Sequence, residues 1–519
     1  MNKLALRAVS KLSADVKRRR GIVALTVVLL ALYLVDSLTR YRSYLTDGYD
    51  LGIFDQAVRA YAHFQSPIVA LKGQGFNLLG DHFHPIIAAF APLYWIWDNP
   101  CVLLIGQAVV VVASVPVVYG FTRRRAGGAA SLLVAAGYGL GWPMLSLIDF
   151  DFHEIAFANL FMALALDALD RRDDRRLVIW AAALLLVRED MGLLVALLGV
   201  LALFRGGSLS LSGLRAARRR LSNGPVPWVA ASLIIGGAAA FELTTAVVLP
   251  AFAPNHQYAY WQYDALGKNV PDVVTTVFTR PWHLVSVFFS PALKAHTLGY
   301  LLLPLLLLPL RSPYALLSLP IFAERFFNSR DYLWSPHWQY NALPWLILVL
   351  AAVDGAGRFG WFGPGRVAGW GRRAFLCSLL VSPVLVGSFS DGTTGQPQNP
   401  MRRLTGPAWR TTQRMMAQGA AAAIVPRGVC VEADDRIVTH LTARDYVSLP
   451  VMRHETADFI VLDLSEDNVG NFGPTPAAVE EDARAFGYVA VFRQGSMLVL
   501  RSPHYAGPSL QCRPLGHGK

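Results

Sequence analysis

Residues 49–85, between two long apolar segments, contain several acids and imidazoles, among them Asp50, Asp55, Asp81, His82 and His84. Ionisable groups so near apolar spans are costly unless they are paired, hydrated or bound to a ligand. We therefore expect this segment to form the floor of an active site. A carboxylate there could accept a proton from a hydroxyl group, which makes Asp50 and Asp55 candidate catalytic residues. Asp50 is also suited to capping a helix that begins near Leu51, as is Asp47.

Asp81, His82 and His84 have residue types that bind divalent metal ions, and Asp151 and His153 could complete such a site. We expect a divalent ion such as Mn²⁺ or Mg²⁺, which would neutralise a departing phosphate. Imidazole ligands suit Mn²⁺ or Zn²⁺ better than Mg²⁺. The same residues are consistent with a hydrated turn and with polar side chains at a membrane interface.

Further candidates interrupt apolar stretches downstream and could bind substrate: Arg188, Glu189, Arg325, His337 and Tyr340. Charges within membrane segments commonly mark function. The planar guanidinium of Arg188 offers several donors to a phosphate. An ion pair at the apex of a helical hairpin explains Arg188 and Glu189 equally well.

The rest of the chain indicates a multi-pass α-helical membrane protein. Of its 519 residues, 54% are hydrophobic, and apolar runs of bilayer length recur along most of the chain. The net charge of +12 lies in short arginine-rich clusters between those runs: 17–20, 123–125, 171–176, 215–220 and 358–373. This pattern is typical of cytoplasmic loops and argues against nucleic-acid binding.

We predict a basic cytoplasmic N-terminus (1–20) and a membrane domain (21–390) of about 11 crossings, with an external loop at 40–85 and the C-terminus outside. The first span, 21–39, resembles an uncleaved anchor. Residues 177–204 read as two short helices that meet at Arg188-Glu189-Asp190, and 253–296 as an external aromatic loop containing Tyr258 and Tyr260. The remaining predicted spans are 99–122, 128–147, 155–169, 226–250, 297–310, 313–327, 341–354 and 374–389.

Residues 391–519 differ in character and predict a small α/β domain on the external face. A polar linker at 391–400 comes first. Strand signals follow at 429–432, 445–449, 459–464, 488–492 and 497–501, and a helix signal at 476–486 falls between two of them. No glycine-rich phosphate motif follows a strand, so we expect no nucleotide. Cys430 and Cys512 could form a disulfide if this part is exported.

Several fragments resemble a bacterial membrane family catalogued as domain of unknown function 2079: YDLGIFDQ at 49–56, GDHFHP at 80–85, DFHE at 151–154, LLLVRED at 184–190, PHWQY at 336–340, THLTARDYVSLP at 439–450 and ADFIVLDL at 457–464. His84 departs from the family pattern, in which an aliphatic residue or Ser is more frequent. The family is in turn similar to the GT-C glycosyltransferases, which take sugars from polyprenyl-phosphate carriers. In those enzymes an acidic residue in the first external loop is the catalytic base, and Asp50 stands at the matching place.

The resemblance implies a glycosyltransferase in a bacterial plasma membrane. Its partners would be membrane lipids, a polyprenyl-phosphate-linked sugar donor and an envelope glycan or protein acceptor. The alternative is a transporter or flippase for a lipid-linked or anionic solute. The absence of an internal repeat and the gathering of charges on the external side favour the enzyme. A metal-dependent hydrolase is disfavoured because the sequence has no H-E-x-x-H motif.

Overall fold

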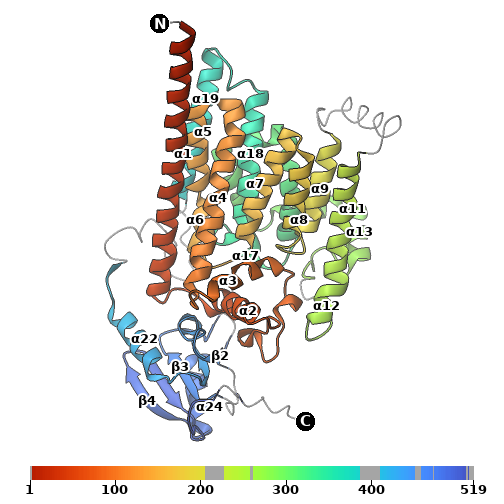
Figure 1. Ribbon diagram of the computed structural model, residues 1–519. Helices are drawn as coiled ribbons and strands as arrows, with labels where there is room; N and C mark the ends of the chain where they lie inside the picture. The colour runs from red at the N-terminus through yellow and green to blue at the C-terminus, as the bar shows by residue number, and fades with distance from the viewer. Residues whose placement is uncertain are drawn as a thin grey trace.

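The computed structural model describes residues 3–204, 227–257, 261–385, 409–450, 457–470, 473–509 and 512. The arginine cluster at 215–220, the linker at 391–400, and Tyr258 and Tyr260 lie outside the described residues. The described part has three layers (Figure 1): a helical bundle, a layer of loops and short helices at one end of it, and a small α/β domain beyond that layer.

The bundle surrounds helix α18 (Ala342–Arg358), in which every residue from Ala342 to Val353 is buried. Around it lie α1 (Lys3–Arg42), α4 (Cys101–Ala126), α5 (Gly128–Gly139), α6 (Trp142–Asp149), α7 (Ile155–Arg171), α8 (Asp174–Leu184), α9 (Met191–Leu203), α11 (Trp228–Leu243), η5 (Thr244–Val248), α12 (Leu249–Phe252), α15 (Ala292–Leu302), α16 (Ser318–Phe326), α19 (Arg366–Leu379) and α20 (Ser382–Leu385). The apolar side chains of the long helices form the core, because packing them together removes apolar surface from water.

Four of the described helices are long and apolar enough to cross a membrane: Arg20–Arg42, Cys101–Ala126, Trp228–Phe252 and Gln339–Arg358. The α5–α6 pair, bent by 41°, makes a fifth if it counts as one span. These agree with the predicted spans at 21–39, 99–122, 226–250, 341–354 and 128–147. Shorter helices α7, α8 and α9 match the prediction at 155–169 and the hairpin at 177–204. The total of about eleven crossings stays a prediction.

Two parts of the predicted topology are wrong. Residues 303–317, expected to belong to two helical spans, instead form the 3₁₀ turns η6 (Leu303–Leu305), η7 (Leu308–Arg311) and η8 (Pro313–Leu317). Prolines at 304, 309 and 313 interrupt any α-helix there, because proline lacks the backbone N–H and clashes with the preceding turn. The segment 253–296, expected to be a loop, contains α13 (Val270–Thr279) and α14 (Pro281–Phe289).

Arginines from the clusters 123–125, 171–176 and 358–373 lie at the end of the bundle opposite the loops, where Arg124, Arg171 and Arg358 pair with acids. Arg125, at the end of α4, pairs with Asp170 of α7 and lies 3.5 Å from Asp354 of α18. These three helices all end within a few residues of the ion pairs. The bundle therefore has one arginine-rich end and one end that carries the predicted site.

The middle layer, which we call the loop layer, consists of residues 43–100 with the connections 150–154, 185–190 and 327–341. Its elements are η1 (Gly48–Gly52), α2 (Ile53–Ala62), η2 (Ala70–Lys72), η3 (Leu78–Gly80), η4 (Pro85–Phe90), α3 (Ala91–Tyr94), α17 (Asp331–Trp334) and η9 (Gln339–Asn341). The predicted short helix after Leu51 is present, and its apolar side chains Leu51, Phe54 and Val58 are buried.

The C-terminal domain comprises α22 (Gln413–Ile424), β1 (Cys430–Ala433), α23 (Asp435–Val438), β2 (Tyr446–Ser448), β3 (Phe459–Asp463), α24 (Pro476–Ala485), β4 (Val489–Gln494) and β5 (Met497–Arg501). The sheet order is β2-β1-β3-β5-β4, with β1 parallel to β2 and β3, and β5 antiparallel to β3 and β4. The strands and the helix lie where the sequence predicts them.

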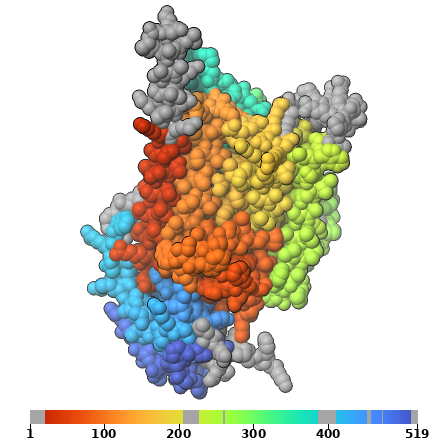
Figure 2. Space-filling model, in the orientation of Figure 1, coloured from red at the N-terminus to blue at the C-terminus, as the bar shows by residue number. Residues whose placement is uncertain are grey.

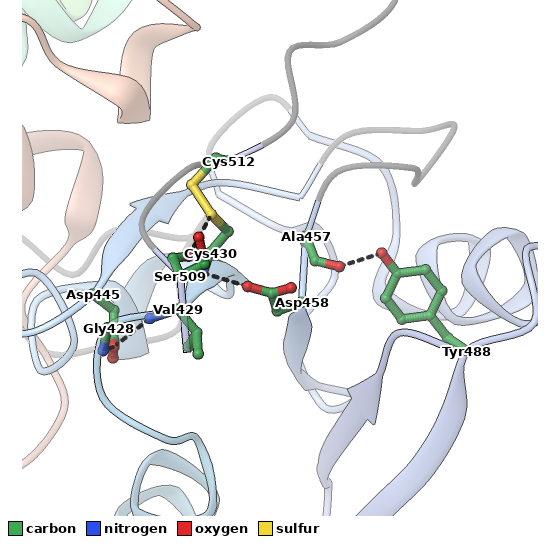
Figure 3. Close-up of a disulfide and its surroundings, with 9 residues drawn as sticks. All are labelled: Gly428, Val429, Cys430, Asp445, Ala457, Asp458, Tyr488, Ser509 and Cys512. Carbon is green, nitrogen blue, oxygen red and sulfur yellow. Dashed lines mark hydrogen bonds between the residues drawn. A yellow bond between two sulfur atoms is a disulfide. The ribbon is translucent and has the colours of Figure 1, made fainter. Parts of the chain in front are cut away.

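The two faces of this sheet pack against different partners. Side chains such as Ile460 and Leu498 form a small core with Val479 of α24. Their neighbours, such as Val461 and Val499, belong instead to the core that continues into the loop layer and the bundle. Figure 2 shows the domain in direct contact with the loop layer. A disulfide joins Cys430 to Cys512 (Figure 3), where the Cys430 N–H also donates to Asp458 at 3.0 Å.

Candidate functional site

Asp50 lies in η1, a single π-helical turn that follows α1. Such turns are rare and often occur at functional sites. Its side chain is 21% exposed, and its Oδ1 atom lies 3.3 Å from Nε2 of His153. Asp50 is inside the turn, and Asp47, which precedes the turn, makes no side-chain capping bond. The capping role is therefore not adopted by either residue.

Asp151 holds the chain that leads into η1. Its carboxylate accepts hydrogen bonds from the Asp47 N–H at 2.6 Å and from Arg40 at 3.2 Å. Asp151 itself has a φ of 34°, in a region that residues other than glycine rarely adopt. Burial, followed by the charge of Asp151, raises the pKa of Asp47 to about 7, although Arg40 opposes the rise.

Gln107 of α4 holds the backbone around His153, the partner of Asp50. Its carbonyl oxygen accepts the N–H of His153 at 2.8 Å, and its amide donates to the carbonyl of Asp151. Burial alone would lower the pKa of His153, but its hydrogen bond to Asp50 and the charges of nearby acids raise it. Gln107 was not predicted, because a single amide in an apolar helix carries no distinctive signal.

Arg188 is held by acids. Its guanidinium binds both carboxylate oxygens of Asp190, at 2.7 and 2.6 Å, and lies 3.8 Å from Glu154. The structure thus contains an ion pair at this apex, as the alternative interpretation of the segment expects. Asp190 binds Nε and Nη2 of Arg188 and leaves Nη1, which lies 3.8 Å from Glu154.

Glu189 binds residues 82 and 83 of the loop layer. Its carboxylate accepts from His82 at 2.7 Å and from the N–H of Phe83 at 3.0 Å. Burial would lower the pKa of His82, but the charge and hydrogen bond of Glu189 outweigh it and raise that pKa to about 9. Asp81 next to it pairs with Lys72 at 2.5 Å.

The predicted metal ligands are thus distributed over separate pairs. Asp81, His82, Asp151 and His153 each contact a different partner, and His84 is buried beside the ring of Phe54. Within the described ranges, no three His, Cys, Asp or Glu side chains converge as metal ligands. The five residues do not form the set that we expected, because ion pairs with fixed protein groups satisfy most of them.

Asp55 and Arg325 also require correction. Asp55 is fully buried, pairs with Arg59 at 2.6 Å and accepts from the Tyr94 hydroxyl at 2.7 Å. Its carboxylate oxygens are thus engaged by Arg59 and Tyr94, which favours a structural role over the predicted catalytic one. Arg325, 4% exposed, donates to the carbonyls of Leu333 and Tyr340 and to the side chain of Asn341. These bonds hold the connection 327–341 in shape.

The polar contacts of the loop layer alternate with steps along the backbone. Asp50 contacts His153, whose neighbour Glu154 lies 3.8 Å from Arg188, and the residue after Arg188, Glu189, binds His82. Asp151 accepts from the Asp47 N–H. These contacts link residues 47–82 to the connections 150–154 and 185–190.

An aromatic group borders Asp50. The ring of Phe150 lies 5.1 Å from that of His153 and 4.8 Å from that of Trp338, measured between centroids. Phe150 and Trp338 are both half-buried. Trp338 belongs to the PHWQY fragment, together with the predicted residues His337 and Tyr340. The sequence singled out those two and missed Trp338, although an aromatic residue among polar ones was the available signal.

Comparison with protein families gives one match, which covers residues 40–478 and is described as "Predicted membrane protein (DUF2079)". The chain belongs to this family. The DUF2079 match contains Asp50, His153, Arg188 and Trp338, and ends within α24, before β4 and β5. No curated protein matches this DUF2079 member.

Two solved structures are similar to this DUF2079 member. ArnT from Cupriavidus metallidurans bound to undecaprenyl phosphate has a TM-score of 0.46 and 10% identity, and the similarity covers 92% of this chain and 97% of that one. The same protein in the apo state has a TM-score of 0.45 and 11% identity, with the same coverage.

Proposed function

We propose that this DUF2079 member is a GT-C-like glycosyltransferase that moves a sugar from a polyprenyl-phosphate donor to an envelope acceptor, with Asp50 as general base. The proposal rests chiefly on the partly exposed Asp50 carboxylate beside His153 in the loop layer. That layer would face the outside of the plasma membrane, because the arginine-rich end of the bundle lies at its far side. The C-terminal domain would then be extracytoplasmic.

In the proposed reaction the Asp50 carboxylate accepts the proton of an acceptor hydroxyl. The acceptor oxygen forms a bond to the anomeric carbon, and the bond from that carbon to the phosphate oxygen breaks. The polyprenyl phosphate departs with the electron pair, and the anomeric configuration inverts. His153, when protonated, donates to the Asp50 carboxylate and so fixes its orientation.

The donor would lie between the aromatic group and Arg188. The half-buried rings of Phe150 and Trp338 offer apolar faces on which a sugar ring can pack. Arg188 is the candidate for the donor phosphate, through the Nη1 side that Asp190 leaves unused. A divalent ion at the phosphate stays a prediction from the sequence, and the mechanism does not depend on it.

The test is an Asp50→Asn variant expressed in a strain that lacks the native gene, with the envelope glycans analysed. The exposed Asp264 provides the matched control, Asp264→Asn. We expect Asp50→Asn to lower transfer by about 10² to 10⁴-fold, the usual contribution of a general base, at unchanged protein level. Wild-type glycans from Asp50→Asn would remove Asp50 as the base.

A further inference from the structure

The C-terminal domain contacts the turn that carries Asp50. The N–H of Tyr49, directly before Asp50, donates to Oδ1 of Asp435 at 2.8 Å. The Thr46 and Thr439 hydroxyls, from the same two segments, lie 3.1 Å apart. Residues 435–440, which we call the clamp segment, therefore meet η1 through hydrogen bonds as well as apolar packing.

The packing between the clamp segment and η1 is too close for a side chain at two positions. A Cβ atom on Gly48 would lie 2.7 Å from Cγ1 of Val438. On Gly52 it would lie 3.2 Å from the same atom and 2.8 Å from Leu71. The two glycines that bound the π-turn thus allow Val438 to rest against its backbone.

A stacked ring extends the contact to the end of α1. The imidazole of His440 lies between the rings of Tyr41 and Tyr44, with centroids 4.3 and 3.9 Å away at small interplanar angles. Farther along, Gln56 of α2 donates to the carbonyl of Val447 at 2.8 Å. The domain thus contacts the chain before, within and after η1.

We propose that the C-terminal domain is a working part of the active site, in which the clamp segment fixes the π-turn that presents Asp50 and Asp435 is a positioning residue. This inference rests on the proposed function. The reason is geometric, because the first N–H groups of a helical turn lack partners within it. Asp435 supplies the partner for Tyr49 and so sets the direction in which Asp50 leaves the turn.

The proposed role of Asp435 requires a side-chain oxygen that accepts the Tyr49 N–H, and it does not require a negative charge. It is buried at 5% exposure and faces the acids Asp47, Asp50 and Asp434. Burial and the charge of Asp47 raise the pKa of Asp435 well above its ordinary value. A neutral amide oxygen should therefore replace the carboxyl oxygen as acceptor for the Tyr49 N–H.

The first experiment compares Asp435→Asn and Asp435→Ala in the full chain. It measures kcat and the KM for the polyprenyl-phosphate-linked sugar donor. We expect Asp435→Ala to lower kcat by about 10 to 100-fold, because misplacing a catalytic group by 1 Å costs about that much, with little change in KM. Asp435→Asn should stay within a few-fold of wild type. Glu480→Gln is the matched control, since Glu480 pairs with Arg484 on α24, across the sheet from the clamp. Wild-type kcat for a folded Asp435→Ala overturns the proposal.

A second pair of variants keeps the test valid if Asp435→Ala does not fold. Gly48→Ala should lower kcat through its clash with Val438, and adding Val438→Gly should restore part of the loss. Failure of the second change to restore any activity, with both proteins folded, contradicts the clamp.

A third measurement separates this inference from the proposed function. Cysteines introduced at Thr46 and Thr439 should form a cross-link in the full chain under mild oxidation, whatever reaction the protein performs. If Asp50→Asn remains active while the cross-link forms, the proposed function fails and the contact stands. If no cross-link forms, the clamp itself is wrong.

Discussion

The Nε2 atom of His153 lies 3.3 Å from the Oδ1 atom of Asp50, although the two residues come from the connections that follow α6 and α1. Gln107 of α4 holds the backbone of His153, and Asp151 holds the chain before Asp50. Two loops of the bundle therefore converge on one acid–imidazole pair, and the bundle determines their spacing.

Replacing His153 should change the pH dependence of the reaction. The hydrogen bond to Asp50 and the charges of nearby acids outweigh burial and raise the pKa of His153, so its positive charge persists to a higher pH than in a free imidazole and is lost as the pH rises through that pKa. We expect kcat/KM of the wild type to fall as the pH rises through this value. His153→Gln should lack this fall and should be about 10 to 100-fold slower, as expected for loss of a charged hydrogen bond. An unchanged alkaline limb in His153→Gln would exclude this role.

The pair of His82 and Glu189 should make stability depend on pH. Because its partner raises the pKa of His82 from 6.5 to about 9, the stabilisation is complete below pH 6.5 and is lost as the pH rises through about 9. We expect a loss of about 1 to 3 kcal/mol over this window. Thermal unfolding in detergent at pH 6 and pH 9.5 measures it, and His82→Gln should be less sensitive to this change of pH.

Asp55 should matter for folding and not for chemistry. Asp55→Ala removes the buried partner of Arg59, which keeps its bonds to Asp98 and to the Thr442 carbonyl. We therefore expect a loss of about 1.5 to 3 kcal/mol in the free energy of unfolding, the usual contribution of a hydrogen bond to a charged group. The kcat of the protein that remains folded should match wild type. A folded Asp55→Ala variant with a hundredfold lower kcat would restore Asp55 as a catalytic candidate.

Trp338 should affect binding of the sugar donor. If its half-buried face packs against the sugar, Trp338→Ala should raise KM by about fivefold, in line with about 1 kcal/mol for an aromatic contact, with a smaller change in kcat. Trp338→Phe should recover most of the affinity. Equal kinetics in all three proteins would place the sugar elsewhere.

The disulfide should stabilise the C-terminal domain. The bond between Cys430 and Cys512 closes a loop with a sequence separation of 82 residues, and such bonds typically contribute about 2 to 4 kcal/mol. Cys430→Ser should lower the unfolding temperature and increase proteolysis of this domain. The exposed Cys377 provides the control, and Cys377→Ser should behave as wild type.

The sequence predicts the elements of this protein better than their contacts. Short strand signals located all five strands, an amphipathic pattern located α24, and the spacing of Leu51, Phe54 and Val58 located the helix after η1. Residues 303–317 were misjudged because leucine-rich composition outweighed the three prolines that prevent a continuous helix.

The partners in the site were harder to predict. Asp55 and Asp50 look alike in the sequence, and only the neighbouring Arg59 and Tyr94 show that Asp55 is enclosed. Asp435 is separated from Tyr49 by 386 positions, and no local pattern links them. Long-range pairing of this kind depends on the fold and not on spacing along the chain.

That separation also bears on how the protein is made. The turn around Asp50 leaves the ribosome early, whereas residues 435–440 that complete its surroundings are synthesised near the end. Domains generally fold in the order of their synthesis. The newly inserted bundle would therefore carry an unfinished turn around Asp50 until the last part of the chain has folded against it, and a truncated product would lack the contacts that complete this turn.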